Sequence, residues 1–510
     1  MFGESMIRLD NVTYRYRNED RPVLKDLNLA VKAGETVSVM GANGSGKSTL
    51  AKVLAGLIEV DRGRIRVETD EDAPLPVGIL FQNPDNQMVS VTVEKEIAFA
   101  LENLGVSQEK MEAMITDTLE RFSIGHLRER LNSELSGGEK QRVALAAVMV
   151  CSPPILVLDE PDSFLDESGK AILMRQLLNL RRTNPAMIQI HITQYPGIAR
   201  NYSRLIVLDQ GEVVADASPR EIFNQKDFCL RTGLLFSGEA DRQVLVPGKT
   251  NGYSPIQTDG PHTLVLDKAC FSYNENHPVL KNISFQMRRS EIMGVVGPTG
   301  SGKSSLGLLL CGLLKPSSGM IKYLDGRKRE IAPDRLVGHV SAVFQQPERQ
   351  FFLPTCAEEI SFGPRNVGHP LSDGDIDSQL AMVGLDPGTF TSKDPFTLSG
   401  GEKRRLAFAA VLSMRPQFVV FDEPTCGLDQ EGVGRFITLV QLLKDQGMGI
   451  TIISHDGGVI KGLADRILHL RSDLSWTERT NKEFFTSQHW VGVVSQPDED
   501  IESTPEIFDK

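Results

Sequence analysis

The chain of 510 residues lacks any apolar run long enough to cross a membrane. A spanning helix needs about 20 consecutive, mostly apolar residues, so we expect none. The first five residues, Met1 to Ser5, contain neither a basic region nor an apolar core. The sequence therefore predicts no secretory signal peptide.

The chain also has few cysteines and no excess of positive charge. Its six cysteines stand far apart, without the close pairing typical of metal sites: Cys151, Cys229, Cys270, Cys311, Cys356 and Cys426. Reduced thiols in a cytosolic protein are the simplest interpretation. The formal net charge of −12 argues against broad binding to nucleic acid or anionic lipid.

What the chain does contain is two copies of a phosphate-binding pattern. Residues 41–49 read Gly-Ala-Asn-Gly-Ser-Gly-Lys-Ser-Thr, between an apolar run at 36–40 and a good helix former at 50–55. Residues 297–305 read Gly-Pro-Thr-Gly-Ser-Gly-Lys-Ser-Ser and follow a similar apolar run at 292–296. A strand, a glycine-rich loop and a helix in this order predict a P-loop.

The chemistry of these loops suits a nucleotide. Glycines let backbone N–H groups approach an anion, and the helix start adds free N–H donors. Lys47 and Lys303 supply a positive charge for the β- and γ-phosphates. The hydroxyl groups of Ser48 and Ser304 are suited to ligating Mg2+.

The sequence contains two copies of one domain. Lys47 and Lys303 stand 256 residues apart, whereas Gln82 and Gln345 stand 263 apart, as do Asp159 and Asp422. We predict a first domain at 1–236, a Pro- and Gly-containing linker at 237–262, a second domain at 263–492 and a disordered acidic tail at 493–510.

Each copy contains a second glycine-rich helix start. Leu-Ser-Gly-Gly-Glu occurs at 135–139 and at 398–402, each time before a helical pattern. Ser136 and Ser399 are good helix N-caps, and the exposed N–H groups suit phosphate. Plain helix capping is the alternative interpretation of this motif alone.

A buried strand then ends in two carboxylates in each copy. The strands are 155–159 and 418–422, and the acids are Asp159 with Glu160 and Asp422 with Glu423. Ligands of open α/β sheets bind at the carboxyl ends of the strands. The aspartate is suited to holding Mg2+ and the glutamate to orienting or deprotonating water.

Three further features complete the pattern. The last strands, at 187–193 and 449–454, lead to Gln194 in copy one and His455 in copy two. His191 lies inside its strand, so we interpret it as a packed histidine. Tyr16 and Tyr273 are placed either to stack on adenine or simply at a strand edge. Between Gln82 and about residue 150, three-four apolar spacing predicts a helical insertion.

The order Tyr, P-loop, Gln, Leu-Ser-Gly-Gly-Glu, Asp-Glu and His resembles the nucleotide-binding domain of ABC ATPases, over nearly the whole chain. The resemblance implies an α/β fold of two P-loop NTPase domains. Each would have a RecA-like parallel-sheet core, an N-terminal antiparallel β part and a helical insertion. It also implies that ATP lies between the P-loop of one domain and the Leu-Ser-Gly-Gly-Glu motif of the other.

The resemblance implies two sites, which we name after the copy that supplies the P-loop. Site one would use Tyr16, Gly41, Asn43, Gly44, Gly46, Lys47, Ser48, Thr49, Gln82, Asp159, Glu160 and Gln194, with Ser399, Gly400 and Gly401 of copy two. Site two would use Tyr273, Gly297, Thr299, Gly300, Gly302, Lys303, Ser304, Ser305, Gln345, Asp422, Glu423 and His455, with Ser136, Gly137 and Gly138 of copy one.

Within these sets the resemblance assigns roles. The catalytic residues would be Glu160, Glu423, His455 and Gln194. The Mg2+ ligands would be Ser48, Gln82 and Asp159 in site one, and Ser304, Gln345 and Asp422 in site two. Gln194 departs from the family pattern because a neutral amide replaces the histidine. We therefore expect site two to hydrolyse ATP faster than site one.

The segments after the two glutamines, 81–87 and 344–350, resemble those of ATPases in energy-coupling factor transporters, which import vitamins or transition metals. This resemblance implies a transmembrane coupling protein and a small substrate-binding membrane protein as partners, no nucleic acid, and a peripheral position on the cytoplasmic face of the cell membrane. Asp85 and Glu348 would meet basic residues of the coupling protein, unless they are simply solvated acids.

Two other functions stay open at this point. A soluble ABC protein acting on the ribosome should carry a long basic linker, whereas this linker is short and not notably basic. A tandem ATPase of a sugar importer has a similar length. In such proteins the second half usually departs more from the consensus, whereas here copy two keeps it better.

Overall fold

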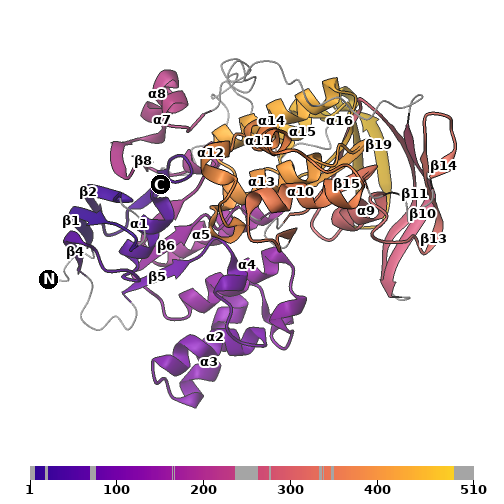
Figure 1. Cartoon of the computed structure of the whole chain (residues 1–510). Helices are drawn as coiled ribbons and strands as arrows, with labels where there is room; N and C mark the ends of the chain where they lie inside the picture. Colours follow the sequence, from indigo (N-terminus) through magenta and orange to yellow (C-terminus); the bar gives the residue numbers. More distant parts are fainter. Residues whose placement is uncertain are drawn as a thin grey trace.

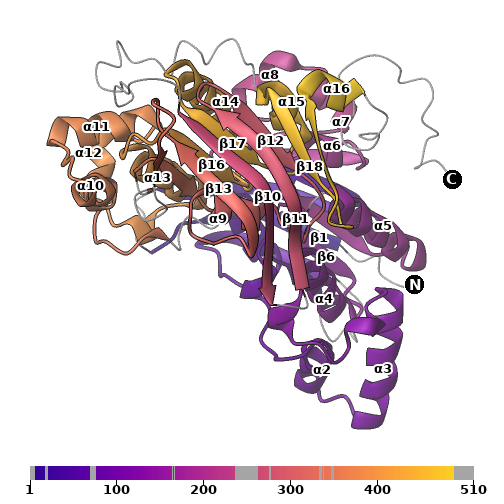
Figure 2. The ribbon, with the colours of Figure 1, turned by 90° about the vertical axis from the view of Figure 1, so that its right-hand side faces the viewer.

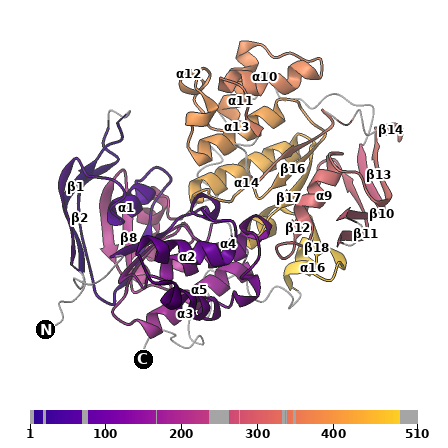
Figure 3. The same ribbon diagram turned by 90° about the horizontal axis from the view of Figure 1, so that it is seen from below.

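The computed structural model describes residues 6–17, 21–68, 76–163, 165, 167–235, 262–274, 277–331, 336, 338–345 and 350–486. Of the predicted linker only His262 is described, and the predicted acidic tail lies outside these ranges. The chain forms two similar halves, seen from three directions in Figures 1 to 3. No helix in the described ranges is long and apolar enough to span a membrane.

The core of the first half is a six-stranded sheet with the order β5-β6-β7-β3-β8-β9. Its first five strands run parallel, and β9 pairs antiparallel with β8. The strands are β3 (Thr36–Met40), β5 (Val77–Leu80), β6 (Ile155–Asp159), β7 (Ile188–Ile192), β8 (Arg204–Asp209) and β9 (Glu212–Ala217).

The second half repeats this topology in the order β15-β16-β17-β12-β18-β19. Its strands are β12 (Ile292–Val296), β15 (Val340–Val343), β16 (Phe418–Asp422), β17 (Gly449–Ile453), β18 (Arg466–Leu470) and β19 (Trp476–Thr480). Each P-loop strand lies between the strand that leads to Gln194 or His455 and the next strand of the sheet, so the equivalent strand ends meet at one edge.

Each half also has a smaller antiparallel sheet, as the sequence predicts. In the first half its order is β2-β1-β4, and in the second half β11-β10-β13-β14. The strands are β1 (Met6–Tyr14), β2 (Leu24–Lys32), β4 (Arg62–Glu68), β10 (Thr263–Asn274), β11 (His277–Arg288), β13 (Ser318–Leu324) and β14 (Glu330–Ile331). Figure 2 shows β10, β11 and β13 side by side in front of the second core sheet.

Helices cover the core sheets and form the predicted insertions. The first half has α1 (Lys47–Leu54), α2 (Val93–Asn103), α3 (Gln108–Arg121), α4 (Gly137–Met149), α5 (Glu167–Thr183), α6 (Pro196–Ala199), α7 (Pro219–Phe223) and α8 (Lys226–Arg231). The second half has α9 (Lys303–Leu310), α10 (Cys356–Asn366), α11 (Asp373–Met382), α12 (Pro387–Phe390), α13 (Gly400–Leu412), α14 (Gln430–Asp445), α15 (Gly457–Leu463) and α16 (Asn481–Thr486).

The apolar pattern of the sequence explains the layers. Every residue of β3, β6, β7, β12, β16 and β17 is buried, which fits parallel strands covered on both faces. The helices α2 and α3 extend from the first half (Figure 1), and α10, α11 and α12 extend from the second half (Figure 3). The predicted α/β class, with antiparallel strands and helices added to parallel cores, is confirmed.

Candidate functional site

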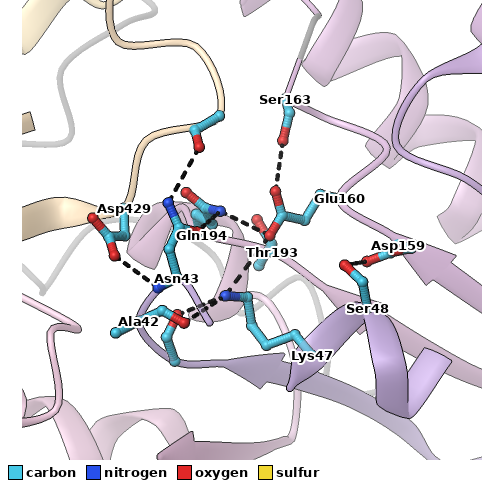
Figure 4. Close-up of polar contacts among 12 residues, drawn as sticks. Ala42, Asn43, Lys47, Ser48, Asp159, Glu160, Ser163, Thr193, Gln194 and Asp429 are labelled. Carbon is cyan, nitrogen blue, oxygen red and sulfur yellow. Dashed lines mark hydrogen bonds and ion pairs between the residues drawn. The ribbon is translucent and has the colours of Figure 1, made fainter. Parts of the chain in front are cut away.

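The P-loop of the first half connects β3 to α1. Gly46, the residue before α1, has a φ angle of 101°, and a Cβ atom there would lie 2.8 Å from Leu24 Cδ2. Only glycine adopts this turn without strain. The buried Lys47 ammonium group donates to the carbonyl oxygens of Gly41 and Ala42 at 2.9 and 3.0 Å. Figure 4 shows this arrangement.

The second P-loop has the same geometry between β12 and α9. Gly302 has a φ angle of 89°, and Lys303 Nζ donates to Gly297 O and Pro298 O, both at 2.9 Å. In both halves the lysine ammonium therefore lies inside the curve of its own loop. That is where an anionic group would meet the positive charge and the N–H groups of the helix start.

In the first half, Glu160 accepts hydrogen bonds from three side chains. Gln82 Nε2 and Ser163 Oγ donate to Glu160 Oε2 at 3.1 and 3.2 Å. Gln194 Nε2 donates to Glu160 Oε1 at 2.8 Å, and Lys47 Nζ lies 3.9 Å from that oxygen. Burial raises the pKa of the Glu160 carboxyl group, although the Lys47 charge opposes the shift. Glu160 is therefore held in one orientation (Figure 4).

The equivalent Glu423 has fewer contacts. The backbone N–H of His455 donates to Glu423 Oε2 at 3.4 Å, and His455 Nε2 lies 3.4 Å from Oε1. Burial, together with the nearby charge of Asp422, raises the pKa of Glu423 to about 8. The second glutamate is thus less constrained than the first, and its basicity is higher than that of an ordinary carboxylate.

The first half has a buried polar network that the second half lacks. Asp162 accepts from Thr193 Oγ1 at 2.6 Å and contacts His191 Nε2 at 3.1 Å, and His191 Nδ1 lies 2.5 Å from the Tyr202 hydroxyl. These residues follow Glu160 or flank Gln194 in the chain. The corresponding positions in the second half are Thr425, Ser454, Ile452 and Leu463. The interpretation of His191 as a packed strand histidine agrees with its complete burial.

Two cavities lie between the halves, and each is lined by residues of both. The cavity at the first P-loop, of about 720 Å3, is lined by Asn43, Gly44, Gly46, Lys47, Ser48, Thr49, Gln82, Glu160 and Gln194, and from the second half by Ser399, Gly400, Gly401 and Glu402. The arginines Arg404, Arg405 and Arg435 also line it. The predicted set for site one is therefore largely brought together here, whereas Tyr16, Gly41 and Asp159 do not line this cavity.

The cavity at the second P-loop has a volume of about 570 Å3. It is lined by Tyr273, Thr299, Gly300, Gly302, Lys303, Ser304, Ser305, Gln345, Asp422, Glu423 and His455, and from the first half by Gly137 and Ser163. Ser136 and Gly138 line an adjoining cavity of about 210 Å3, together with Pro298 and Thr299 of the second P-loop. Each P-loop therefore shares a cavity with residues of the other half.

Direct contacts join the halves beside the first cavity. The backbone N–H of Asn43 donates to Asp429 Oδ2 at 2.7 Å, and Asn43 Nδ2 donates to Gly427 O at 3.4 Å. Cys426 Sγ donates to Ser163 O at 2.8 Å. Sequence reasoning missed these contacts, although Asp429 and Cys426 follow Glu423 closely in the chain.

Both Leu-Ser-Gly-Gly-Glu motifs begin a helix with a capping box. The side chain of Ser136 accepts from the backbone N–H of Glu139, whose carboxylate accepts from the N–H of Ser136, and Ser399 and Glu402 repeat the arrangement. Helix capping and a phosphate-facing position are compatible, because the glycines Gly137, Gly400 and Gly401 line the cavities.

The two tyrosines contact equivalent hydroxyl groups at the starts of the P-loop helices. The Tyr16 hydroxyl lies 3.2 Å from Thr49 Oγ1, and the Tyr273 hydroxyl lies 3.1 Å from Ser305 Oγ. Each ring packs edge-on against a neighbouring aromatic ring, Tyr14 or Phe271. The exposed fraction of Tyr273 is 60%, so this side chain is accessible to a ligand.

The residues beside each lysine suit a magnesium ion. Ser48 Oγ donates to Asp159 Oδ1 at 3.1 Å, and Ser304 hydrogen-bonds Asp422 in the same way. Among the described residues, Asp422 Oδ1 is buried without a hydrogen-bond partner. Hydroxyl, carboxylate and amide oxygens are the donors that Mg2+ prefers, with phosphate oxygens completing its coordination.

Comparison with known proteins decides the family. The model of the family described as ABC transporter matches residues 24–163 and 280–426, which together make up more than half of the chain. The chain belongs to the ABC transporter family. The resemblance inferred from the motifs is thereby confirmed, and the chain is an ABC ATPase with two copies of the ATP-hydrolysing domain.

Several relatives resemble this ABC ATPase over most of its length. An ABC transporter ATP-binding protein of Methanosarcina mazei is 32% identical over 92% of this chain and 93% of its own length. A Bacillus subtilis protein named as an HMP/thiamine import ATP-binding protein, YkoD, is 30% identical over 92% and 90%. The Bifidobacterium longum protein BL0043 is 30% identical over 91% of this chain, which spans 64% of that longer protein.

A solved structure of similar type is that of cbiO1 from Clostridium perfringens, described as part of the ABC transporter complex cbiONQ. It is 29% identical and covers 45% of this chain and 95% of its own, with a TM-score of 0.40.

Proposed function

We propose that this chain is the ATP-hydrolysing subunit of a membrane importer of the energy-coupling factor type. One observation carries the proposal: each P-loop lysine shares its cavity with the glycine-rich helix start of the other half. The cavity of Lys47 is also lined by Ser399, Gly400 and Gly401, and the cavity of Lys303 is also lined by Gly137. Two anion-binding helix starts on opposite sides of one cavity suit a triphosphate held between the halves.

In each site, different residues bind the phosphates, orient the attacking water and bind the metal ion. Lys47 or Lys303 and the N–H groups of the P-loop bind the β- and γ-phosphates, and Ser399 or Ser136 with its glycines binds the γ-phosphate from the opposite half. Glu160 or Glu423 orients the attacking water and accepts its proton. Ser48 and Asp159, or Ser304 and Asp422, would hold Mg2+, which would neutralise charge at the phosphates.

The importer assignment is supported by a relative and by two matching surfaces. YkoD, similar over 92% of this chain, carries an import name. Shortly after each cavity glutamine, apolar side chains are exposed at equivalent positions: Val89 (64%) with Phe99 (45%), and Phe352 (60%) with Phe362 (40%). Apolar side chains that are exposed together on a surface indicate an interaction site.

These apolar surfaces are held to the body of each half by a buried acid. Glu96 Oε2 accepts hydrogen bonds from the backbone N–H of Val89 at 3.1 Å and from that of Ser90 at 2.8 Å. Glu359 accepts from the N–H groups of Phe352 and Leu353 at 2.5 and 2.6 Å. We propose that a transmembrane coupling protein, with a small substrate-binding membrane protein, docks here and positions the subunit on the cytoplasmic face of the membrane.

Asp85, proposed above as a contact of the coupling protein, already has an ion pair within its own half. Lys140 Nζ lies 2.6 Å from Asp85 Oδ1, although half of the Asp85 side chain stays exposed. Glu348 lies outside the described residues. The apolar side chains are therefore the stronger candidates for the docking contact.

A structure with a non-hydrolysable ATP analogue and Mg2+ tests the sites. We expect Ser399 to contact the triphosphate that Lys47 binds, and Ser136 to contact the one that Lys303 binds. A triphosphate contacted by one half alone would refute the composite sites.

The partner is tested by affinity purification of the tagged chain from detergent-solubilised membranes. We expect integral membrane proteins in stoichiometric amounts. Co-sedimentation with ribosomes instead would favour a soluble ABC protein, and capture of a sugar permease would favour the sugar-importer alternative.

A further inference from the structure

Arg404 lies in α13, five residues after Ser399, and has an exposed fraction of only 7%. Its guanidinium group donates to three backbone carbonyls. Nη2 donates to Gln345 O at 3.0 Å, and Nη1 donates to Pro424 O at 3.3 Å and to Cys426 O. Arginine suits this position because its planar fork offers five donors in fixed directions.

These contacts connect three parts of the second half. Gln345 begins the segment that leads to the apolar surface at Phe352, Pro424 follows Glu423, and Cys426 begins the segment 426–429. Since a buried carbonyl is costly to leave unpaired, the guanidinium group holds the positions of these backbone segments relative to α13. The Arg404 side chain is therefore one of the groups that fix residues 426–429, together with the cap that Asp429 forms on α14.

The segment 426–429 makes its contacts in the other half. Gly427 O and Asp429 Oδ2 accept from Asn43 in the first P-loop. Cys426 Sγ donates to the carbonyl of Ser163, whose hydroxyl donates to Glu160 at 3.2 Å. Arg404 is thus connected to the first P-loop through the segment 426–429, and to Glu160 through Cys426 and Ser163.

The first half has no matching arginine. Gln141 occupies the equivalent position in α4 and has an exposed fraction of 3%. Among the described residues, its Nε2 atom has no hydrogen-bond partner. A glutamine is therefore accommodated in this environment without forming the three carbonyl contacts.

We propose that Arg404 is a positioning residue that acts across the interface: it fixes the segment 426–429 of the second half, which in turn orders the first P-loop for nucleotide. The inference rests on the proposed function, because it concerns ATP at site one. On this proposal, nucleotide binding at site one depends on Arg404 of the second half and on its contact with the Gln345 segment. Nucleotide binding at site two has no equivalent dependence on Gln141.

The test uses the full chain with Mg2+ and a photoactivatable azido analogue of ATP. After illumination, proteolysis between the halves separates them, and the label on each half reports the occupancy of its own P-loop. For Arg404→Gln we expect the affinity of the first half to fall about tenfold and that of the second half to change less than twofold. Arg404→Lys, which keeps the charge but not the fork, should restore part of the loss.

A purely structural role of Arg404 predicts the opposite pattern. Damage to its own half would reduce labelling of the second half at least as much as that of the first, and this result would overturn the inference, as would unchanged labelling of both halves. Arg365→Gln removes an exposed charge from the same half and should change neither label. If Arg404→Gln fails to fold, the Arg404→Lys comparison decides between the same two patterns.

The experiment also separates this inference from the proposed function. A wild-type chain that takes no label on either half would refute both. Labelling of both halves in the wild type, with equal losses in the variant, would refute only the role of Arg404.

Discussion

At the scale of single residues, the two halves differ most in how they hold the glutamate after the aspartate. Gln194 donates one hydrogen bond to Glu160 and another, at 3.0 Å, to Asn43 Oδ1. Its amide is therefore engaged with groups of its own half. His455, by contrast, has an imidazole that can become cationic and assist at a phosphate oxygen.

We expect site two to hydrolyse ATP faster than site one. Loss of a charge-assisted hydrogen bond costs about 1–2 kcal/mol, or roughly tenfold in rate. In steady-state ATPase assays, Glu423→Gln should therefore remove most of the activity and Glu160→Gln a smaller part. Equal losses in the two variants would remove the claim of asymmetry.

A second residue-scale prediction concerns Asp162, which is buried with His191 and Thr193. Burial tends to raise the pKa of Asp162, but the hydrogen bonds and charge of His191 outweigh it and the pKa is lowered. Asp162→Ala removes one partner of a buried pair, so the free energy of unfolding should fall by about 3 kcal/mol at neutral pH.

Because its folded pKa is below the unfolded value, Asp162 stabilises the fold above about pH 4, the ordinary aspartate value, and the contribution is lost as the pH falls further. Denaturant unfolding of wild type and Asp162→Ala at several pH values measures this. Asp117→Ala, at an exposed helix ion pair with Arg121, is the control and should cost less than about 0.5 kcal/mol. A similar cost for both variants would contradict the assignment.

At the scale of elements, the helical insertions connect the cavities to the apolar surfaces. In each half one helix carries an exposed phenylalanine, Phe99 in α2 or Phe362 in α10, next to the segment that starts at the cavity glutamine. Phe352 and Phe362 pack edge-on with ring centres 4.8 Å apart. The equivalence of these positions suits a partner that contacts both halves in similar ways.

We expect Phe99→Asp combined with Phe362→Asp to abolish stable association with the membrane partner, since a carboxylate would have to be desolvated in the interface. The ATPase activity of the isolated chain should stay within about twofold of wild type, because neither residue lines either of the two P-loop cavities. Co-purification from membranes measures the first effect. Wild-type yield of the complex would contradict the docking surface. Leu230→Asp, at an exposed leucine of α8, is the matched control.

At the scale of the whole molecule, a single chain supplies both sides of both cavities. Joining two binding partners covalently raises their effective concentration, typically to the millimolar range for short linkers. Among the described residues, Asn43 donates to Asp429 and Gly427, and Cys426 donates to Ser163, across the interface. Because of this effective concentration, closure of the halves should depend on their covalent connection.

Cutting the chain between the halves tests this dependence. We expect the ATPase activity of the cut protein to fall with dilution into the nanomolar range, while the intact chain keeps a constant specific activity. Activity that is independent of concentration in the cut protein would show that each half acts alone. The intact chain carried through the same protease treatment with inhibitor is the control.

The sequence by itself determined the two P-loops, the repeat, the parallel cores and the helical insertions. Local signals sufficed for these features, because glycine spacing, apolar strands and serine caps act within a few neighbouring residues. The strand Ile155–Asp159 has its predicted bounds, and the helix α4 begins directly after the predicted N-cap Ser136.

Only the tertiary structure decided which residues meet across the interface. Asn43 and Asp429 stand 386 residues apart, and no periodicity indicates that they touch. The same holds for Arg404, whose carbonyl partners are backbone atoms without a sequence signature, and for the buried network of Asp162. Contacts of this kind arise from the packing of two complete halves, so they become visible only when both have been folded against each other.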